Sequence, residues 1–261
     1  MLLTTEGVVI REKQVGETDK FIDVLTRDYG ILEISVKGVR KVTSKSASST
    51  QLFAYAVFCV QKRGERFYLN SCEPKHIFYD LRLDINKFAL ASYFSEILQF
   101  SVTSNEPAED ILRLFLNSLH FLTQGDKSLS LIKSIFEFRI LADIGMMPDV
   151  VGCRNCRQYS SEKMYFNMND GVLYCEKCVS DPKRDEIFLL TPSLLHAVRY
   201  IVLTEFDRLW NFKLSEEALQ GLNFLSENYL AAQLGRNFKT LDFYRSCAGM
   251  YQIPANPYGE E

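Results

Sequence analysis

The sequence lacks the residue patterns of the common enzyme classes. It has no Walker-type phosphate loop, no G-x-S-x-G turn around a nucleophilic serine and no dinucleotide-binding glycine fingerprint. Histidine is scarce, and its three copies, His76, His120 and His196, stand where a partly buried structural histidine is the simpler interpretation. The acidic pair Glu216 and Glu217 is typical of the first turn of a helix, where it complements the helix dipole. We therefore expect a protein that is not an enzyme.

Long apolar runs are also missing. No run of about 18 or more consecutive apolar residues occurs, which argues against a membrane span. The first ten residues, MLLTTEGVVI, lack the basic start and the apolar stretch of a secretory signal, so we expect a cytoplasmic protein. With 261 residues, 47% of them hydrophobic, the chain is long enough for two domains and an insert.

The chain has no overall excess of positive charge. Its 30 Lys and Arg residues face 33 Asp and Glu residues, for a net charge of −3. The charge is uneven, however, because residues 36–66 hold seven basic residues and a single acidic one. Such a patch can bind nucleic acid or be an ordinary solvated surface, and charge alone does not separate the two.

The first eighty residues show the pattern of short strands. In ILEISVKG, the residues Leu32, Ile34 and Val36 alternate with polar residues, as in a half-buried strand. Gly16 and Gly64 each separate two further β-rich runs, and the polar tract RKVTSKSASST is typical of an exposed loop. Five strands in about eighty residues, with no helix between them, predict a small closed or nearly closed barrel.

Beyond Pro74 the hydrophobic period becomes helical. Apolar residues recur at helical spacing from Phe88 to Val102 and from Ile111 to Leu122, and a third helix is expected to stop at Gly145. After a cysteine-rich segment, helices resume at TPSLLHAVRYIVL and at SEEALQGLNFLSENYLAAQLG. In the former, Thr191 can cap the helix and Pro192 can take its first position.

Four cysteines have the spacing of a metal site. Cys153, Cys156, Cys175 and Cys178 form C-x2-C-x18-C-x2-C, and two such turns supply the four thiolates of a tetrahedral Zn²⁺. No βαβ unit surrounds them, as a thioredoxin-like redox site would require, and a reducing cytoplasm disfavours disulfides. The alternative is four free or partly oxidised thiols. We expect one structural zinc ion per chain.

The other three cysteines fall outside this spacing. Cys59, Cys72 and Cys247 are interpreted as small hydrophobic residues of the core.

The basic residues of the N-terminal region can meet on one side of the barrel. Lys37, Arg40, Lys41 and Lys45 follow one strand end, whereas Lys62, Arg63 and Arg66 surround a neighbouring hairpin turn. Nearby aromatic residues can either stack on bases or fill the barrel core, and the second role is expected for at least half of Phe53, Tyr55, Phe67 and Tyr68.

The order of these parts resembles the bacterial RecO family of recombination mediators. The resemblance rests on TRDYGILEISVKGVRK, TQLFAYAVF, the helical region, the four cysteines and LGRNFKTLDFYRS, and it covers nearly the whole chain. It implies an α+β fold with an N-terminal OB-fold barrel and a helical domain that carries an inserted zinc-binding module. The expected domains are the OB-fold over 1–80, the helical domain over 81–149 and 181–250, the zinc-binding insert over 150–180 and a C-terminal tail over 251–261.

The resemblance also implies a function. Members bind single- and double-stranded DNA, anneal complementary strands, engage the acidic C-terminal tail of the single-stranded DNA-binding protein SSB, and join RecR to help load RecA in the RecF pathway. A protein of this kind is expected in the cytoplasm, on the nucleoid when it is bound to DNA.

The resemblance and the charge pattern together predict particular contact residues. Carried onto the KGVRK run, the DNA contacts are Lys37, Arg40 and Lys41, and charge clustering adds Lys45, Arg63 and Arg66. In LGRNFKT, Arg236 and Lys239 are candidates for a second DNA contact or for the SSB tail, although cations that balance a helix C-terminus would look the same.

A second function remains open from the residues alone. The chain can be a zinc-ribbon adaptor that binds only proteins, with its barrel as an interaction surface and no direct contact with DNA.

Overall fold

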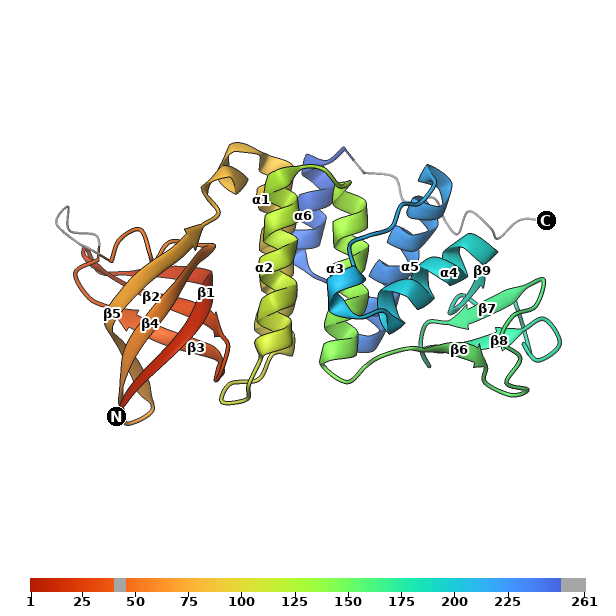
Figure 1. The fold of residues 1–261 in the computed structure, drawn as a ribbon, viewed down its shortest axis with the longest axis horizontal. Helices are drawn as coiled ribbons and strands as arrows, with labels where there is room; N and C mark the ends of the chain where they lie inside the picture. The colour runs from red at the N-terminus through yellow and green to blue at the C-terminus, as the bar shows by residue number, and fades with distance from the viewer. Residues whose placement is uncertain (40–45, 250–261) are drawn as a thin grey trace. The chain divides into compact units, whose positions relative to one another are not determined.

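A computed structural model describes residues 1–39 and 46–249 of the chain. Within them the chain forms two compact units, which are described separately below (Figure 1). The barrel unit comprises Met1–Asp126 and Phe238–Cys247, and the cysteine unit comprises Lys127–Asn237 and Ala248–Glu261.

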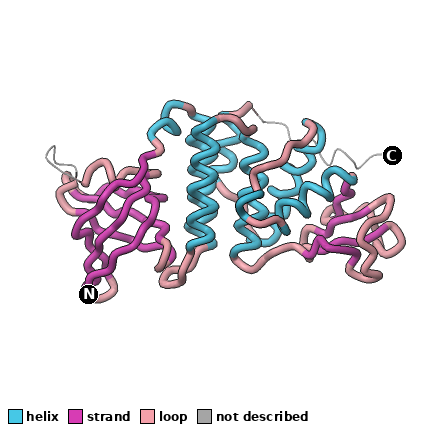
Figure 2. The backbone as a smooth tube through the Cα atoms, in the orientation of Figure 1, coloured by secondary structure: helices cyan, strands magenta, loops and turns pink. Residues whose placement is uncertain are grey.

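Five strands close into a barrel in the order β1-β2-β3-β5-β4, seen in magenta in Figure 2. All neighbouring pairs are antiparallel except β3 and β5, which run parallel. Each strand pairs with two neighbours, and five strands in this arrangement are the OB-like architecture. The predicted barrel is therefore confirmed. Its strands are β1 (Leu2–Val15), β2 (Asp19–Thr26), β3 (Gly30–Val36), β4 (Ala54–Arg63) and β5 (Arg66–Ile77).

The alternation in β3 explains why this segment is a strand. Leu32, Ile34 and Val36 are buried in the barrel core, whereas Glu33 is exposed and Ser35 is half-buried. The two glycine turns also lie where the sequence predicts them. Gly16 and Gly64 both have a φ near +60°, a conformation that glycine adopts without steric cost.

Three helices and a 3₁₀ turn complete the barrel unit. Phe53 is fully buried and its ring lies 5.8 Å from that of Phe88 and 6.3 Å from that of Phe115, so it joins the barrel to the first two helices. The elements are η1 (Tyr79–Leu83), α1 (Ile85–Ser101), α2 (Glu109–Gln124) and α6 (Lys239–Cys247).

The sequence pattern missed the short helix α6. Its nine residues are held by tertiary contacts, since the Thr240 backbone N–H donates to the Glu96 carboxylate of α1 at 3.0 Å and the Thr240 hydroxyl donates to the same oxygen. The ring of Phe238, just before α6, also lies edge-on to that of Tyr93 in α1, at 5.7 Å. A helix this short depends on such packing for its stability.

The cysteine unit combines three helices with a four-stranded sheet. The predicted caps are confirmed: the Thr191 hydroxyl accepts from the Leu194 N–H at 3.3 Å, and Pro192 is the first residue of its helix. The sheet, ordered β6-β8-β7-β9, was not predicted. The elements are α3 (Leu129–Asp143), β6 (Asp149–Cys153), β7 (Met164–Asn167), β8 (Val172–Cys175), β9 (Ile187–Leu190), α4 (Pro192–Leu203), η2 (Phe206–Arg208) and α5 (Glu216–Leu234).

The compact units divide the chain differently from the predicted domains. Helices α1, α2 and α6 belong to the same unit as the barrel, whereas the prediction assigns them to one helical domain with α3 to α5. The predicted tail over 251–261 lies outside the described residues. Among the described residues, no helix combines the length and the apolar character needed to cross a membrane.

Candidate metal centre and basic surface

The structure brings the four predicted cysteines together. Cys153 ends β6 and Cys175 ends β8, and each is followed by a tight turn that carries the second cysteine of its pair. In these turns the Arg157 N–H donates to the Cys153 carbonyl and the Cys178 N–H donates to the Cys175 carbonyl, both at 2.9 Å. We call these four residues the cysteine cluster. All four Sγ atoms lie within 4.8 Å of one another.

The geometry fits a tetrahedral metal ion. Four sulfurs that each lie about 2.3 Å from a shared zinc ion are separated by about 3.8 Å, and the Sγ atoms of Cys156 and Cys175 lie 3.6 Å apart. Burial opposes ionisation of Cys153, but hydrogen bonds from the backbone of Cys156, Cys175 and Asn155 lower its pKa to about 6. A thiolate is the form that binds metal, so the cluster could hold a metal ion.

Two glycines near the cysteine cluster stand at positions where a side chain would meet its neighbours too closely. A Cβ on Gly152 would lie 3.0 Å from the Arg157 carbonyl oxygen, and one on Gly171 would lie 2.6 Å from the Tyr229 hydroxyl. The Gly171 turn also has a positive φ of 66°. The close neighbour is a backbone carbonyl at Gly152 and the Tyr229 side chain at Gly171, and neither position leaves room for a larger residue.

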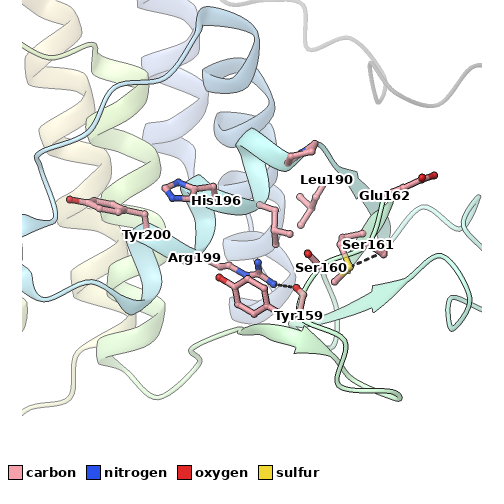
Figure 3. A pocket seen from close by; sticks show the side chains of 11 residues that line it. Tyr159, Ser160, Ser161, Glu162, Leu190, His196, Arg199 and Tyr200 are labelled. Atoms are coloured by element: carbon pink, nitrogen blue, oxygen red, sulfur yellow. Dashed lines mark hydrogen bonds between the residues drawn. The ribbon is translucent and has the colours of Figure 1, made fainter.

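Arg199 of α4 anchors the segment that carries the first cysteine pair. Its Nε donates to the Val150 carbonyl at 2.8 Å and its Nη2 donates to the Val151 carbonyl at 3.0 Å and to the Tyr159 carbonyl. Figure 3 shows the guanidinium under the Tyr159 ring, 3.9 Å from its centre. These side chains border a cavity of about 380 Å³ whose wall includes His196 and Tyr200. Sequence reasoning missed Arg199, because no motif marks an arginine that bonds to distant carbonyls.

A second group of functional candidates lies at the end of β3 and on the β4–β5 hairpin of the barrel. Lys37 Nζ lies 5.8 Å and the Arg63 guanidinium 5.5 Å from the centre of the Tyr68 ring. Lys62 lies over Phe67 at 5.5 Å, and Arg66 faces Arg63 across the hairpin. We call Lys37, Lys62, Arg63 and Arg66 the basic cluster. The strand end and the hairpin are thus neighbours, and they place two cations beside the Tyr68 ring and a third over the Phe67 ring.

The remaining aromatic candidates have structural roles. Phe53 is buried, and Phe67 packs against the barrel core. The Tyr55 hydroxyl donates to the Glu6 carboxylate, which also accepts from Lys75. Of the four predicted aromatic residues, Tyr68 is the one whose ring lies beside two cations of the basic cluster.

Several predicted contact residues are placed differently or not at all. Arg40, Lys41 and Lys45 lie outside the described residues. Arg236 follows the left-handed Gly235 that ends α5, where a cation complements the helix dipole, whereas Lys239 is the first residue of α6, where it does not.

The three histidines each lie beside an aromatic ring. His76 meets Phe78 at 4.5 Å, His120 meets Phe121 at 5.4 Å and His196 meets Tyr200 at 6.5 Å between ring centres.

The cysteines outside the cluster are half-buried rather than buried. Cys72 packs against the barrel core, as expected of a small hydrophobic residue. Cys59 instead lies 3.7 Å from the Asn70 side-chain nitrogen.

Comparison with known proteins gives a consistent result. Residues 1–78 match the family described as "Recombination protein O N terminal", and residues 82–242 match "Recombination protein O C terminal". A protein named "DNA repair protein RecO" from Acetivibrio thermocellus is 32% identical over 94% of this chain and 96% of its own length. Proteins of the same name from Alkaliphilus metalliredigens and Bacillus subtilis strain 168 are each 28% identical, over 93% and 97% of this chain and 98% of their own lengths.

Proposed function

Because the chain belongs to the RecO family of DNA repair proteins, we propose that it is a DNA-binding recombination mediator and not a catalyst. The observation that carries the proposal is the basic cluster, which gathers four cations at the end of β3 and on the β4–β5 hairpin of a closed barrel, two of them beside the Tyr68 ring. Phosphate contacts dominate the affinity of proteins for nucleic acid, and an aromatic ring beside them can stack on a base.

The arrangement favours an extended single strand. The cations of the basic cluster neutralise successive phosphates, while the Tyr68 ring stacks on a base between them. Such contacts do not depend on sequence, because every base has an aromatic face. A strand held in this way keeps part of its bases accessible, which is the state that annealing to a complementary strand requires. Double-stranded DNA can be held by the phosphate contacts alone.

Family membership supports the rest of the proposed role. We propose that the protein anneals complementary strands in the cytoplasm, binds the SSB tail and RecR, and helps load RecA onto SSB-coated DNA. Arg236 and Lys239 are proposed as contacts for the SSB tail or for DNA, and Arg40, Lys41 and Lys45 as further contacts beside the basic cluster.

We also propose that the cysteine cluster holds one structural zinc ion. Four thiolates complete the tetrahedral coordination of zinc, so no position is left for water or substrate. The ion would stabilise the sheet of the cysteine unit and take no part in a reaction.

The test is the salt dependence of binding to a single-stranded oligonucleotide, measured by fluorescence anisotropy. If each cation of the basic cluster neutralises one phosphate, the cluster should contribute about −2.8 to the slope of log K against log salt, from about −0.7 for each phosphate. The triple variant Lys37→Ala, Lys62→Ala, Arg66→Ala should weaken binding and make the slope shallower by about 2.1.

A charge-matched control separates a local site from general attraction. Lys13, Lys183 and Lys213 are exposed and lie outside the basic cluster, so replacing all three by Ala removes the same charge. This control should keep the slope of the unchanged protein. Equal slopes in both triple variants would place the DNA site elsewhere. A protein that binds no oligonucleotide even at low salt would instead be a protein-binding adaptor.

A further inference from the structure

A cavity of about 360 Å³ lies beside the basic cluster in the barrel unit. It exists because β3 and β5 pair only through Ile34 with Phe67 and Ser35 with Tyr68 within the described residues. Strand β5 begins directly after the hairpin turn at Gly64, only one residue before its first pair with β3. The first half of β3 therefore has the hairpin turn as its neighbour instead of a paired strand. The volume is at the lower end of the range for small-molecule sites, which suits a single ring system.

The far wall of the cavity is fixed by the loop between α1 and α2. The Ser104 hydroxyl donates to the Ile31 carbonyl at 3.0 Å, and the Asn105 N–H donates to the Tyr29 carbonyl at 2.9 Å. A Cβ on Gly30 would lie 2.0 Å from the Thr103 carbonyl oxygen, so only glycine allows this approach. The loop is therefore held against β3, and the cavity is a formed feature of the fold.

Charged groups of both signs line this cavity without pairing. The lining includes the cations Lys62 and Arg66 and the carboxylates Glu33 and Glu65. None of the four forms an ion pair within the part of the chain that the structure describes. A ligand that presents negative charge to the cations and hydrogen-bond donors to the carboxylates would satisfy both sets. A nucleotide has this combination, in its phosphate and in the amino group of its base.

We infer that the cavity binds one unpaired base of a single strand, and that it prefers an amino-bearing base such as cytosine to thymine. The inference rests on the proposed function, because the phosphates of that strand lie on the basic cluster. Phe21 and Phe67 supply apolar faces for the ring. Glu33 accepts hydrogen bonds only, so it pairs with the N4 amino group of cytosine and repels the O4 atom of thymine in the same place.

The polar wall supports this choice. Asn105 is part of the cavity lining, and an asparagine amide has both a donor and an acceptor for the remaining atoms of the base edge. In a duplex this edge is already paired, so the cavity selects single strands over duplex DNA. The basic cluster by itself makes no such distinction between bases.

The test compares binding of deoxycytidine and deoxythymidine oligonucleotides of about 12 nucleotides at pH 7.5 and fixed salt. The unchanged protein should bind the cytidine oligomer about tenfold more tightly, which is within the discrimination of one good base-edge contact. Glu33→Gln keeps the size of the side chain but can donate to O4, so the ratio of the two affinities should fall to about one.

Glu73→Gln is the matched control. Glu73 is exposed on β5 and does not line the cavity, so its replacement removes the same charge and should leave the tenfold ratio unchanged. Equal, salt-sensitive affinities of the unchanged protein for both oligomers would overturn the inference and leave the proposed function standing. Absence of binding to either oligomer would overturn the proposed function itself.

Discussion

The cysteine cluster places four ligand atoms within 4.8 Å of one another, whereas the basic cluster spreads four separate cations over the end of β3 and the β4–β5 hairpin. The cysteines are held by backbone turns and by the Arg199 contacts to carbonyls. Of the cations, Lys37, Arg63 and Arg66 are exposed and Lys62 is half-buried. Metal binding at the cysteine cluster can stabilise the fold. The cations of the basic cluster can exchange bound solvent ions for the phosphates of a nucleic acid. The two regions should therefore respond to different perturbations.

Loss of the metal should give the largest effect, confined to the cysteine unit. Metal binding at such a site contributes on the order of 10 kcal/mol, which is comparable to the stability of a whole domain. Cys153→Ser should abolish zinc binding and raise hydrogen exchange throughout β6 to β9. The barrel strands should keep their protection. Zinc content and hydrogen exchange by mass spectrometry check both parts of this prediction.

Cys247→Ser provides the matched control, because Cys247 is half-buried and lies outside the cysteine cluster. It should bind about one zinc ion per chain and exchange normally. If β6 to β9 stay protected in metal-free protein, the metal does not stabilise the sheet. The cysteine cluster would then not differ from the basic cluster in its effect on stability.

A buried ion network should give the next largest effect. Lys133 of α3 lies 2.9 Å from both the Glu137 carboxylate and the Glu227 carboxylate of α5, and it also bonds to Asn223 at 3.2 Å. Ser226 donates to Glu137 at 2.6 Å. Removing one partner from such a network leaves buried charge uncompensated. Lys133→Met should therefore destabilise the cysteine unit by about 3–5 kcal/mol.

The single tryptophan, Trp210, lies in this unit and is buried, so its fluorescence in urea reports the unfolding of the unit. Lys213→Met removes an exposed lysine of the same unit and should change the midpoint little. Burial also raises the pKa of Glu137. Its carboxyl therefore favours the folded state below about pH 4.5 and loses this contribution as the pH rises. An unchanged midpoint in Lys133→Met would show that the network contributes nothing to stability.

The two regions also differ in how far the sequence predicts them. The cysteine spacing specifies a ligand set because two adjacent turns leave few ways to arrange four thiols. The basic cluster depends on strand register, which a one-residue shift would undo. The sequence predicts that Lys37 and Arg63 are close, but the shared Tyr68 ring appears only when β3 and β5 pair.

Other features could not be predicted from local patterns. Helix α6 is too short for a clear period, and its contacts to Glu96 and Tyr93 lie far away along the chain. Arg199 carries no motif, since its partners are backbone carbonyls. The spacing of Lys133 and Glu137, four residues apart, is a visible signal, but the same spacing is common on exposed helix faces. Burial of the pair becomes evident only once α3 packs on α5.

The barrel should show the smallest effect, and with the opposite dependence on pH. Hydrogen bonds from Lys75 and then from Tyr55 lower the pKa of Glu6, although burial opposes them. A lowered pKa means that Glu6 stabilises the folded barrel above about pH 4.5 and that this contribution is lost as the pH falls through the folded-state pKa. Because the side chains of Lys75 and Glu6 are 41% and 32% exposed, solvent screens the pair and the loss should be below about 1 kcal/mol. The measurement is hydrogen exchange of β1 and β4, corrected for the intrinsic rate. Protection of their amides should be slightly lower at pH 3.5 than at pH 7, and Glu6→Gln should remove this difference. A loss as large in Glu6→Gln as in the unchanged protein would assign the acid sensitivity to another carboxyl group of the barrel.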